Sequence, residues 1–305
     1  MKSHVAVVPA MPGPRDAAEI SRFADYVSLT KPRLNLLVLI TTLAGLYLGA
    51  PEGLPLPLVF HTLAGTAFVA GGAAALNQVW ERDTDRLMRR TASRPMAAGR
   101  LGVAEGTVFG VLLSATGLTE LAWQVNIICA GVAAATLISY VLIYTPLKRV
   151  TSLSTLIGAV PGALPPVIGW AAATNQISAP AVVLFGIDFL WQMPHFLAIA
   201  WLHREDYRKA GIPLLPVVEP DGRRTGQQAL LYAAALWPVS LLPMFVGLAG
   251  LPYSIVATAL GFLLIWLSSE FARQRSSATA RRLFLYSIIY LPLLLGALCI
   301  DRALI

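Results

Sequence analysis

The sequence has few charged residues: only 13% of its 305 residues are charged, whereas about 25% is usual for a soluble domain. It has only two cysteines, Cys129 and Cys299, and both lie within apolar stretches. Neither a disulfide framework nor a cysteine metal cluster is therefore expected. No regular alternation of polar and apolar residues runs through the chain, which argues against a membrane β-barrel. No polar stretch is long enough to bury a core of its own, so a second domain is not expected.

Hydrophobic residues dominate instead. They make up 56% of the chain, and the mean hydropathy is +0.67. Apolar stretches of about the length that crosses a bilayer as a helix lie at 34–50, 57–79, 103–122, 124–143, 154–173, 178–202, 229–249, 251–269 and 282–300. The predicted fold is an all-α membrane protein, a bundle of about nine transmembrane helices around a central cavity that opens near the cytoplasmic face.

The basic residues determine the predicted orientation. If the N-terminus is cytoplasmic, all 23 basic residues except Arg302 lie at the cytoplasmic side, as the positive-inside rule requires. The net charge of +7 then reflects topology, and no nucleic-acid partner is expected. Residues 1–28 lack the apolar core and cleavage site of a signal peptide. We expect a flexible cytoplasmic tail there, followed by a single membrane domain over 29–305.

The most informative segment is the charged block 77–100, NQVWERDTDRLMRRTASRPMAAGR, which follows the second apolar stretch. Asn77, Glu81 and Asp85 are four residues apart, so a helix places them on one face, whereas Asp83 points away. One or two carboxylates and substrate phosphates commonly hold Mg²⁺, and the arginines that follow can grip phosphate oxygens. The block therefore predicts a metal-assisted diphosphate site. The alternative is a solvated helix end laced with ion pairs.

Basic residues on the same predicted side are candidate ligands of the diphosphate. They are Lys31, Arg33, Arg94, Lys148 and Arg149. Taken alone, several of them could be simple anchors that set the topology. Because they gather with the acidic block on one side of the membrane, we expect some of them to reach a diphosphate.

A second polar group follows the sixth apolar stretch, within residues 189–218. Pro194 removes a backbone hydrogen bond and is predicted to break this helix. His195 comes next at membrane depth, where a substrate role and simple packing both remain open. A predicted second acidic or substrate site follows, made of His203, Glu205 and Asp206. For His203 in particular, the alternative is a solvated interfacial position.

Asp188 lies well inside the sixth apolar stretch, seven residues before His195 and on the same face of an unbroken helix. A carboxylate at this depth is a functional candidate, although it could equally be protonated and merely packed. Together the two residues suggest an alternative class of protein, a proton-coupled transporter. A transporter would place its polar groups near the midplane, whereas most polar residues here gather at one face.

These motifs resemble those of the UbiA superfamily of intramembrane prenyltransferases, and within it those of the heme-modifying branch. The resemblance includes LTKPR at 29–33, the acidic block with RPMAAGR at 94–100, YTPLKR at 144–149, and PHF…REDY…AGIPLLPVV. The last stretch separates the heme-modifying branch from relatives that carry a second aspartate-rich motif there. Glu81 departs from the family pattern, which more often has aspartate, and Asp188 matches no family pattern.

The resemblance implies an enzyme of the bacterial inner membrane that transfers the farnesyl group of farnesyl diphosphate to a vinyl group of heme B. The products would be heme O and diphosphate. Mg²⁺ on Asn77, Glu81 and Asp85 would bind the diphosphate, and basic groups would neutralise its developing charge. His195 is a catalytic candidate that would contact the heme, for example as an axial ligand.

The resemblance also implies that aromatic rings stabilise an allylic cation. The candidates are Tyr140, Tyr144, Phe196 and Trp201. Membrane lipid is an implied partner, as is either a downstream heme-modifying enzyme or an oxidase assembly factor. The nearest alternative function is a UbiA-type prenyltransferase that acts on an aromatic or quinone precursor.

Overall fold

The structure, a computed structural model, describes residues 21–304, and every regular element in this part of the chain is a helix. The helices are α1 (Arg22–Leu29), α2 (Pro32–Leu48), α3 (Leu56–Asp85), α4 (Val103–Gln124), α5 (Ile127–Ile138), a π-helical turn (Ser139–Tyr144), α6 (Thr145–Leu147), α7 (Ser154–Gly162), α8 (Pro165–Thr174), α9 (Ala179–Leu202), α10 (Arg204–Lys209), α11 (Leu215–Val218), α12 (Arg223–Phe245), α13 (Leu251–Gln274) and α14 (Ser277–Arg302). The predicted all-α class is confirmed for this part of the chain.

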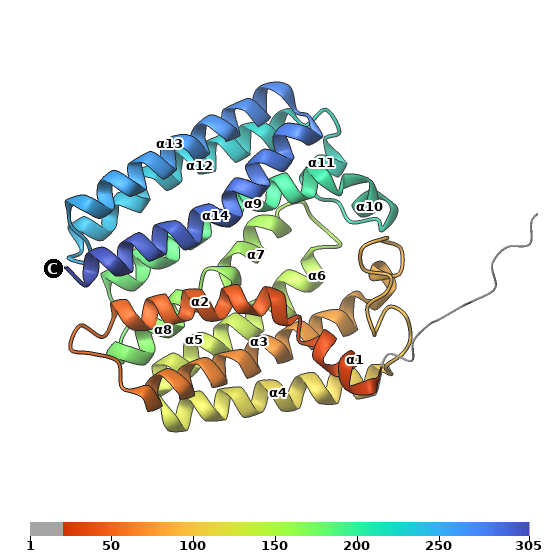
Figure 1. Cartoon of the computed structure of the whole chain (residues 1–305). Helices are drawn as coiled ribbons and strands as arrows, with labels where there is room; N and C mark the ends of the chain where they lie inside the picture. The colour runs from red at the N-terminus through yellow and green to blue at the C-terminus, as the bar shows by residue number, and fades with distance from the viewer. Residues whose placement is uncertain (1–20, 305) are drawn as a thin grey trace, which may run out of the picture.

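The long helices lie side by side and alternate in direction (Figure 1). One group consists of α9, α12, α13 and α14, and a second consists of α2, α3, α4, α5 and α8. Contacts of α7 and α8 with α9, and of α2 with α14, join the two groups. The helices thus form one bundle whose connections lie at two opposite ends.

The two ends of the bundle differ in charge. We call one the basic end; it comprises α1 and the connections 86–102, 148–153, 203–222 and 275–276 (right side of Figure 1). All basic residues of the described part except Arg302 lie in these segments or in the adjoining helix turns. The basic residues are therefore concentrated at one end of an otherwise apolar bundle.

Seven helical segments of the described chain are long and apolar enough to cross a membrane. They are Leu56–Asp85, Ile127–Leu147, Ser154–Thr174, Ala179–Leu202, Arg223–Phe245, Leu251–Gln274 and Ser277–Arg302. Helix α2 is apolar but shorter, and α4 is not among the seven. The protein is therefore a multi-pass membrane protein, and the count of nine spans stays a prediction.

The N-terminal boundary of the domain differs from the predicted one. Residues 22–28 lie within the predicted flexible tail, but they belong to α1, whose Asp25 and Leu29 are buried. Ser21 caps this helix by accepting a hydrogen bond from the amide of Ala24, a contact that stabilises a helix start. The remainder of the predicted tail, residues 1–20, lies outside the described residues.

Proline acts differently in two of the apolar stretches. The stretch 154–173 is divided into α7 and α8 just before Pro165 and Pro166, because two successive prolines have no backbone N–H to donate and so leave two helical hydrogen bonds unmade. Helix α9, in contrast, runs unbroken through Pro194, so the predicted break there is wrong. A membrane helix tolerates one missing backbone hydrogen bond when neighbouring helices enclose the site, and Pro194 is buried. Asp188 and His195 therefore share one continuous helix.

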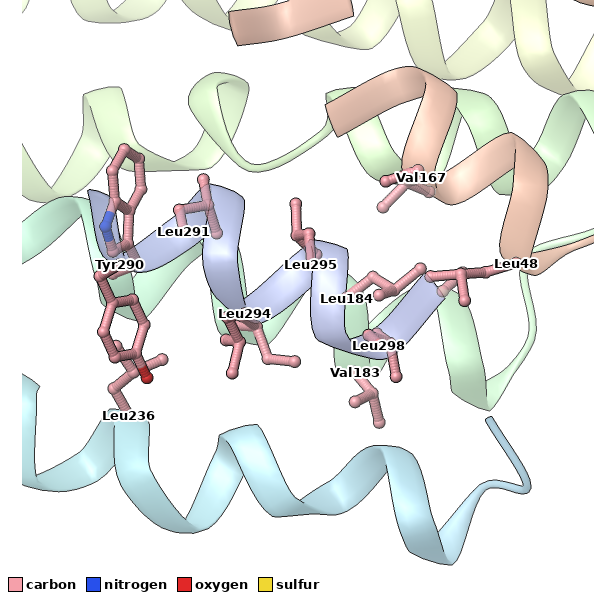
Figure 2. Close-up of a cluster of buried hydrophobic side chains, with 14 of the residues drawn as sticks. Leu48, Val167, Val183, Leu184, Leu236, Tyr290, Leu291, Leu294, Leu295 and Leu298 are labelled. Atoms are coloured by element: carbon pink, nitrogen blue, oxygen red, sulfur yellow. The ribbon is translucent and has the colours of Figure 1, made fainter. Parts of the chain in front are cut away.

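Apolar packing closes the bundle on the side away from the basic end. Leu291, Leu294, Leu295 and Leu298 of α14 point toward neighbouring helices, with Leu184 of α9 among their contacts in the same cluster (Figure 2). All five side chains are buried. These buried apolar contacts hold α14 against the neighbouring helices.

Two glycines allow α2 and α8 to cross closely. A Cβ atom on Gly45 would overlap the backbone oxygen of Pro166, and one on Gly169 would overlap the backbone oxygen of Thr42. Small residues permit such close approach between membrane helices. The crossing is important because α2 begins directly after Lys31, a candidate site residue.

Gly169→Ala is expected to lower the free energy of unfolding by more than about 3 kcal/mol, because the added methyl meets backbone atoms that cannot rotate away. Thermal unfolding of the detergent-purified protein measures the effect. The matched control is Gly296→Ala in α14, where a Cβ meets nothing within 4 Å and the better helix former should be neutral or stabilising. Equal stability of the two variants would contradict the close crossing.

Candidate active site

The predicted acidic series lies on the last turns of α3. Asn77, Glu81 and Asp85 all belong to this helix and are 2%, 5% and 1% exposed, respectively. Their four-residue spacing therefore puts them on the face that points into the bundle, and none of them faces lipid or bulk solvent. Asp83, which was predicted to point away, is exposed and pairs with Arg82 and Arg86.

Each member of the series has a basic partner opposite. Lys31 Nζ donates a hydrogen bond to Asn77 Oδ1 over 2.8 Å. Lys148 Nζ lies 2.9 Å from Glu81 Oε1, and Arg94 Nη1 lies 2.7 Å from Asp85 Oδ2.

The three cations come from three separate segments of the chain. Lys31 follows α1, Arg94 lies within the α3–α4 connection, and Lys148 follows α6. The fold thus assembles a column of oxygen ligands beside a column of cations.

Backbone conformation places Lys31 at the site. It occupies the junction of α1 and α2 with a positive φ of 48°, a conformation that is uncommon for a residue with a side chain. Burial, reinforced by the nearby guanidinium of Arg94, lowers the pKa of Lys31 to about 7. An anion bound between the cations would offset this electrostatic cost.

The connection 86–102 is folded back on itself, and its arginines hold it there. Arg86 donates to the carbonyl of Ala97. Arg100 donates to the carbonyl of Ser93 and pairs with the buried carboxylate of Asp25 over 2.9 Å. These contacts fasten the connection to α1 and so fix the position of Arg94.

The residues present fit a divalent cation that prefers oxygen ligands. Asp85 Oδ1 is buried and has no hydrogen-bond partner among the described residues, although such an oxygen normally has one. No cluster of three or more His, Cys, Asp or Glu side chains suited to a metal occurs in the described chain. The site offers two carboxylates and one amide, which suits Mg²⁺ because this ion usually completes its shell with substrate phosphates and water.

Two of the predicted diphosphate ligands lie apart from the column. Arg33 is exposed and makes no hydrogen bond or ion pair with the described residues. Arg149 is exposed and donates to the carbonyl of Trp80. Of the five predicted cations, the structure therefore brings Lys31, Arg94 and Lys148 together around α3.

The predicted second acidic site is more open. His203 and Glu205 are exposed, and Glu205 pairs with Arg208 one turn later. Burial, reinforced by nearby Arg90, lowers the pKa of His203. Asp206 is half-buried and makes no ion pair within residues 21–304. No compact carboxylate site forms in this region.

A contact that the sequence did not predict links the two regions. Arg90 donates to the hydroxyl of Tyr207 over 2.8 Å, and its guanidinium lies 5.4 Å from the centre of that ring. A second unpredicted contact joins Asn77 Nδ2 to Thr145 Oγ1 over 3.2 Å. Each pair joins segments far apart in the chain, so the spacing of residues carried no signal for them.

The aromatic candidates fall into different surroundings. Tyr140 and Tyr144 stack on each other with ring centres 5.5 Å apart, one turn before Lys148. Phe196 contacts the His195 ring edge-on. Trp201 instead packs against the guanidinium of Arg204 at 4.4 Å. Of the aromatic candidates, the two tyrosines are therefore the pair that precedes Lys148 of the cation column directly in the chain.

His195 and Asp188 lie on α9, among apolar neighbours. His195 Nδ1 is 2.8 Å from Ser287 Oγ of α14, and the imidazole stacks on Trp191. Asp188 is 4% exposed and forms no ion pair with described residues. Gln192 donates to the backbone carbonyl of Asp188 and to that of Ala159 in α7. This polar face of α9 thus extends between α7 and α14.

Comparisons with known proteins place this geometry in a family. The chain matches the UbiA prenyltransferase family over residues 38–290. The protoheme IX farnesyltransferase of Solibacter usitatus is 45% identical to it over 287 residues, which are 91% of this chain and 98% of that relative. The protoheme IX farnesyltransferase of Myxococcus xanthus is 44% identical over 280 residues, covering 92% of this chain and 95% of that relative.

Solved structures show the same fold at low identity. A structure of a digeranylgeranylglyceryl phosphate synthase aligns with a TM-score of 0.79 and 18% identity, over 93% of this chain and 99% of that chain. A UbiA homolog from Archaeoglobus fulgidus bound to GPP and Mg²⁺ aligns with a TM-score of 0.64 and 16% identity, over 90% and 99%. With the match over 38–290 and relatives above 40% identity along nearly their whole length, the chain belongs to the UbiA prenyltransferase family.

Proposed function

We propose that the protein transfers the farnesyl group of farnesyl diphosphate to a vinyl group of heme B, giving heme O and diphosphate. The observation that carries the proposal is the column of Asn77, Glu81 and Asp85 with a cation opposite each, inside a membrane bundle. The choice of heme over other acceptors is supported by the near full-length similarity to protoheme IX farnesyltransferases. Family and relatives alike favour an enzyme over a transporter.

The acidic column would hold Mg²⁺ together with the diphosphate. When bound, the ion would supply positive charge beside the leaving group. Lys31, Arg94 and Lys148 already point at the oxygen ligands, so small side-chain movements would let them bind phosphate oxygens. Fixed cations in a buried site stabilise charge that develops on a leaving group, because they need no reorganisation during the reaction.

The chemical step breaks the allylic C–O bond and leaves its electron pair on the diphosphate. The π electrons of the heme vinyl group form the new C–C bond, and a water molecule adds to the resulting cation and loses a proton. The rings of Tyr140 and Tyr144, which stack on each other, would stabilise the allylic cation. The apolar interior of the bundle would keep bulk water from that cation.

The proposed location is the bacterial inner membrane, with the N-terminus and the basic end on the cytoplasmic side. Concentration of the basic residues at one end of the bundle supports this orientation. The basic end would also attract the heme propionates and the diphosphate, while the farnesyl chain lies among apolar helices. A downstream heme-modifying enzyme or an oxidase assembly factor remains the proposed recipient of the product.

The product identifies the function directly. Membranes containing the protein, supplied with farnesyl diphosphate, Mg²⁺ and heme B, are expected to form a later-eluting heme on reversed-phase chromatography. Its mass should exceed that of heme B by one farnesyl group and one hydroxyl. Prenylation of an aromatic acid or quinone precursor, with heme B left unchanged by active protein, would assign the chain to a different branch of the family.

A further inference from the structure

The imidazole of His195 is held by a network that joins α9 to α14. Trp191 Nε1 donates to the backbone carbonyl of Ser287 over 2.7 Å. Ser287 Oγ donates to the backbone carbonyl of Phe284 over 2.7 Å and lies 2.8 Å from His195 Nδ1. The side chain of Ser287 is fully buried, so water does not compete for these bonds.

This network favours one tautomer of His195. A serine hydroxyl has one hydrogen to donate and two lone pairs that accept. A Ser287 hydroxyl that donates its hydrogen to the Phe284 carbonyl accepts at the second contact, and Nδ1 of His195 then carries the proton. In a neutral imidazole with the proton on Nδ1, the other nitrogen, Nε2, has a free lone pair.

Aromatic rings fix the orientation of the imidazole. The ring of Trp191 stacks on it with centres 5.1 Å apart and planes at 23°. Phe284 approaches at 5.2 Å and Phe196 at 5.5 Å. Nε2 makes no hydrogen bond with any residue from 21 to 304, and the ring is not fully buried. The aromatic rings therefore hold the imidazole in place, and Nε2 has no partner within residues 21–304.

We propose that Ser287 is a positioning residue that holds His195 with its proton on Nδ1, so that Nε2 ligates the iron of the heme substrate. A histidine that ligates a metal characteristically donates its other ring N–H to a fixed acceptor, which sets the tautomer and strengthens the ligand. Ser287 is such an acceptor. The inference rests on the proposed function, because it takes heme B as the substrate.

Spectral titration with heme B, in the absence of farnesyl diphosphate, tests the inference. The purified protein is expected to give a nitrogen-ligated heme spectrum that His195→Ala abolishes. Ser287→Ala should weaken heme affinity about 10- to 100-fold, whereas Ser287→Thr, which keeps the hydroxyl, should restore most of it. Metal-free protoporphyrin IX should bind all these variants alike, because it offers no iron.

A matched control separates ligation from folding. Ser114 is also a buried helical serine, and its hydroxyl bonds only to the carbonyl of Gly110 in its own helix. Ser114→Ala should therefore leave the heme spectrum and affinity unchanged.

Two results would overturn the inference. One is an unchanged heme spectrum in Ser287→Ala or His195→Ala. The other is an equal loss of heme and metal-free protoporphyrin binding, which would indicate only a damaged pocket. If the wild type farnesylates heme B without a nitrogen-ligated spectrum, the ligation fails while the proposed function stands. If no heme product forms at all, the proposed function fails.

Discussion

Asp85→Asn is expected to lower the rate of farnesyl transfer by roughly 10²- to 10³-fold, the usual effect of removing one electrostatic group from a preorganised site. One carboxylate oxygen of Asp85, Oδ2, lies 2.7 Å from Arg94 Nη1. The other, Oδ1, is buried and has no hydrogen-bond partner in the described chain. Asparagine keeps the shape of the side chain but loses the charge that a divalent cation requires. Formation of the farnesylated heme, measured against Mg²⁺ concentration, should show both a lower maximum and a weaker dependence on the metal.

Asp83→Asn is the matched control for this variant. Asp83 is an aspartate of the same helix, two residues away, but it is exposed and pairs only with Arg82 and Arg86 among the described residues. Its substitution should leave turnover and Mg²⁺ dependence unchanged. Because Asp85→Asn leaves Arg94 without its anionic partner, thermal unfolding must show that the variant is folded. A folded Asp85→Asn variant with normal turnover would refute the metal site.

The sequence predicted the acidic column because that column is a local pattern. A four-residue spacing on one helix fixes the shared face whatever surrounds it, and apolar stretches indicated most of the helices that surround the face. The sequence predicted that cations lie on the same side of the membrane as the column, but not which cation pairs with which oxygen ligand. Lys31 and Asn77 are 46 positions apart, and Glu81 and Lys148 are 67 apart, so the pairing depends on the packing of separate helices.

Packing also explains other features that the sequence alone does not determine. Pro194 was expected to break its helix because proline removes a backbone hydrogen bond, but the packing of α9 against several neighbours keeps the helix continuous. Arg33 and Arg149 have the right charge and the right side of the bundle, yet their side chains are exposed and outside the column. Ser287, in a stretch that reads only as apolar span, could not be identified without its contact with His195.

Lys148→Met is expected to lower turnover about 100-fold and the free energy of unfolding by about 3 kcal/mol. The side chains alone of Lys148 and Glu81 are 12% and 7% exposed, and their charged atoms lie 2.9 Å apart. Removal of one partner therefore leaves a buried charge without compensation. Lys148→Arg, which keeps the charge, should retain most of the stability and part of the activity. Rates of heme farnesylation and thermal unfolding in detergent measure the two effects separately.

A double-mutant cycle decides whether Lys148 acts on the diphosphate or only neutralises Glu81. If neutralisation were its whole contribution, Lys148 would be dispensable once Glu81→Gln had removed the charge, and the double variant would be as active as Glu81→Gln alone. We expect the double variant to regain stability, because the buried pair is then neutral, and yet to turn over more slowly than Glu81→Gln, with a higher KM for farnesyl diphosphate. The effects of Lys148 on stability and on turnover would then be distinguished. A cation that only neutralises Glu81 is not needed once that charge has been removed, whereas a cation that binds the leaving diphosphate is still needed.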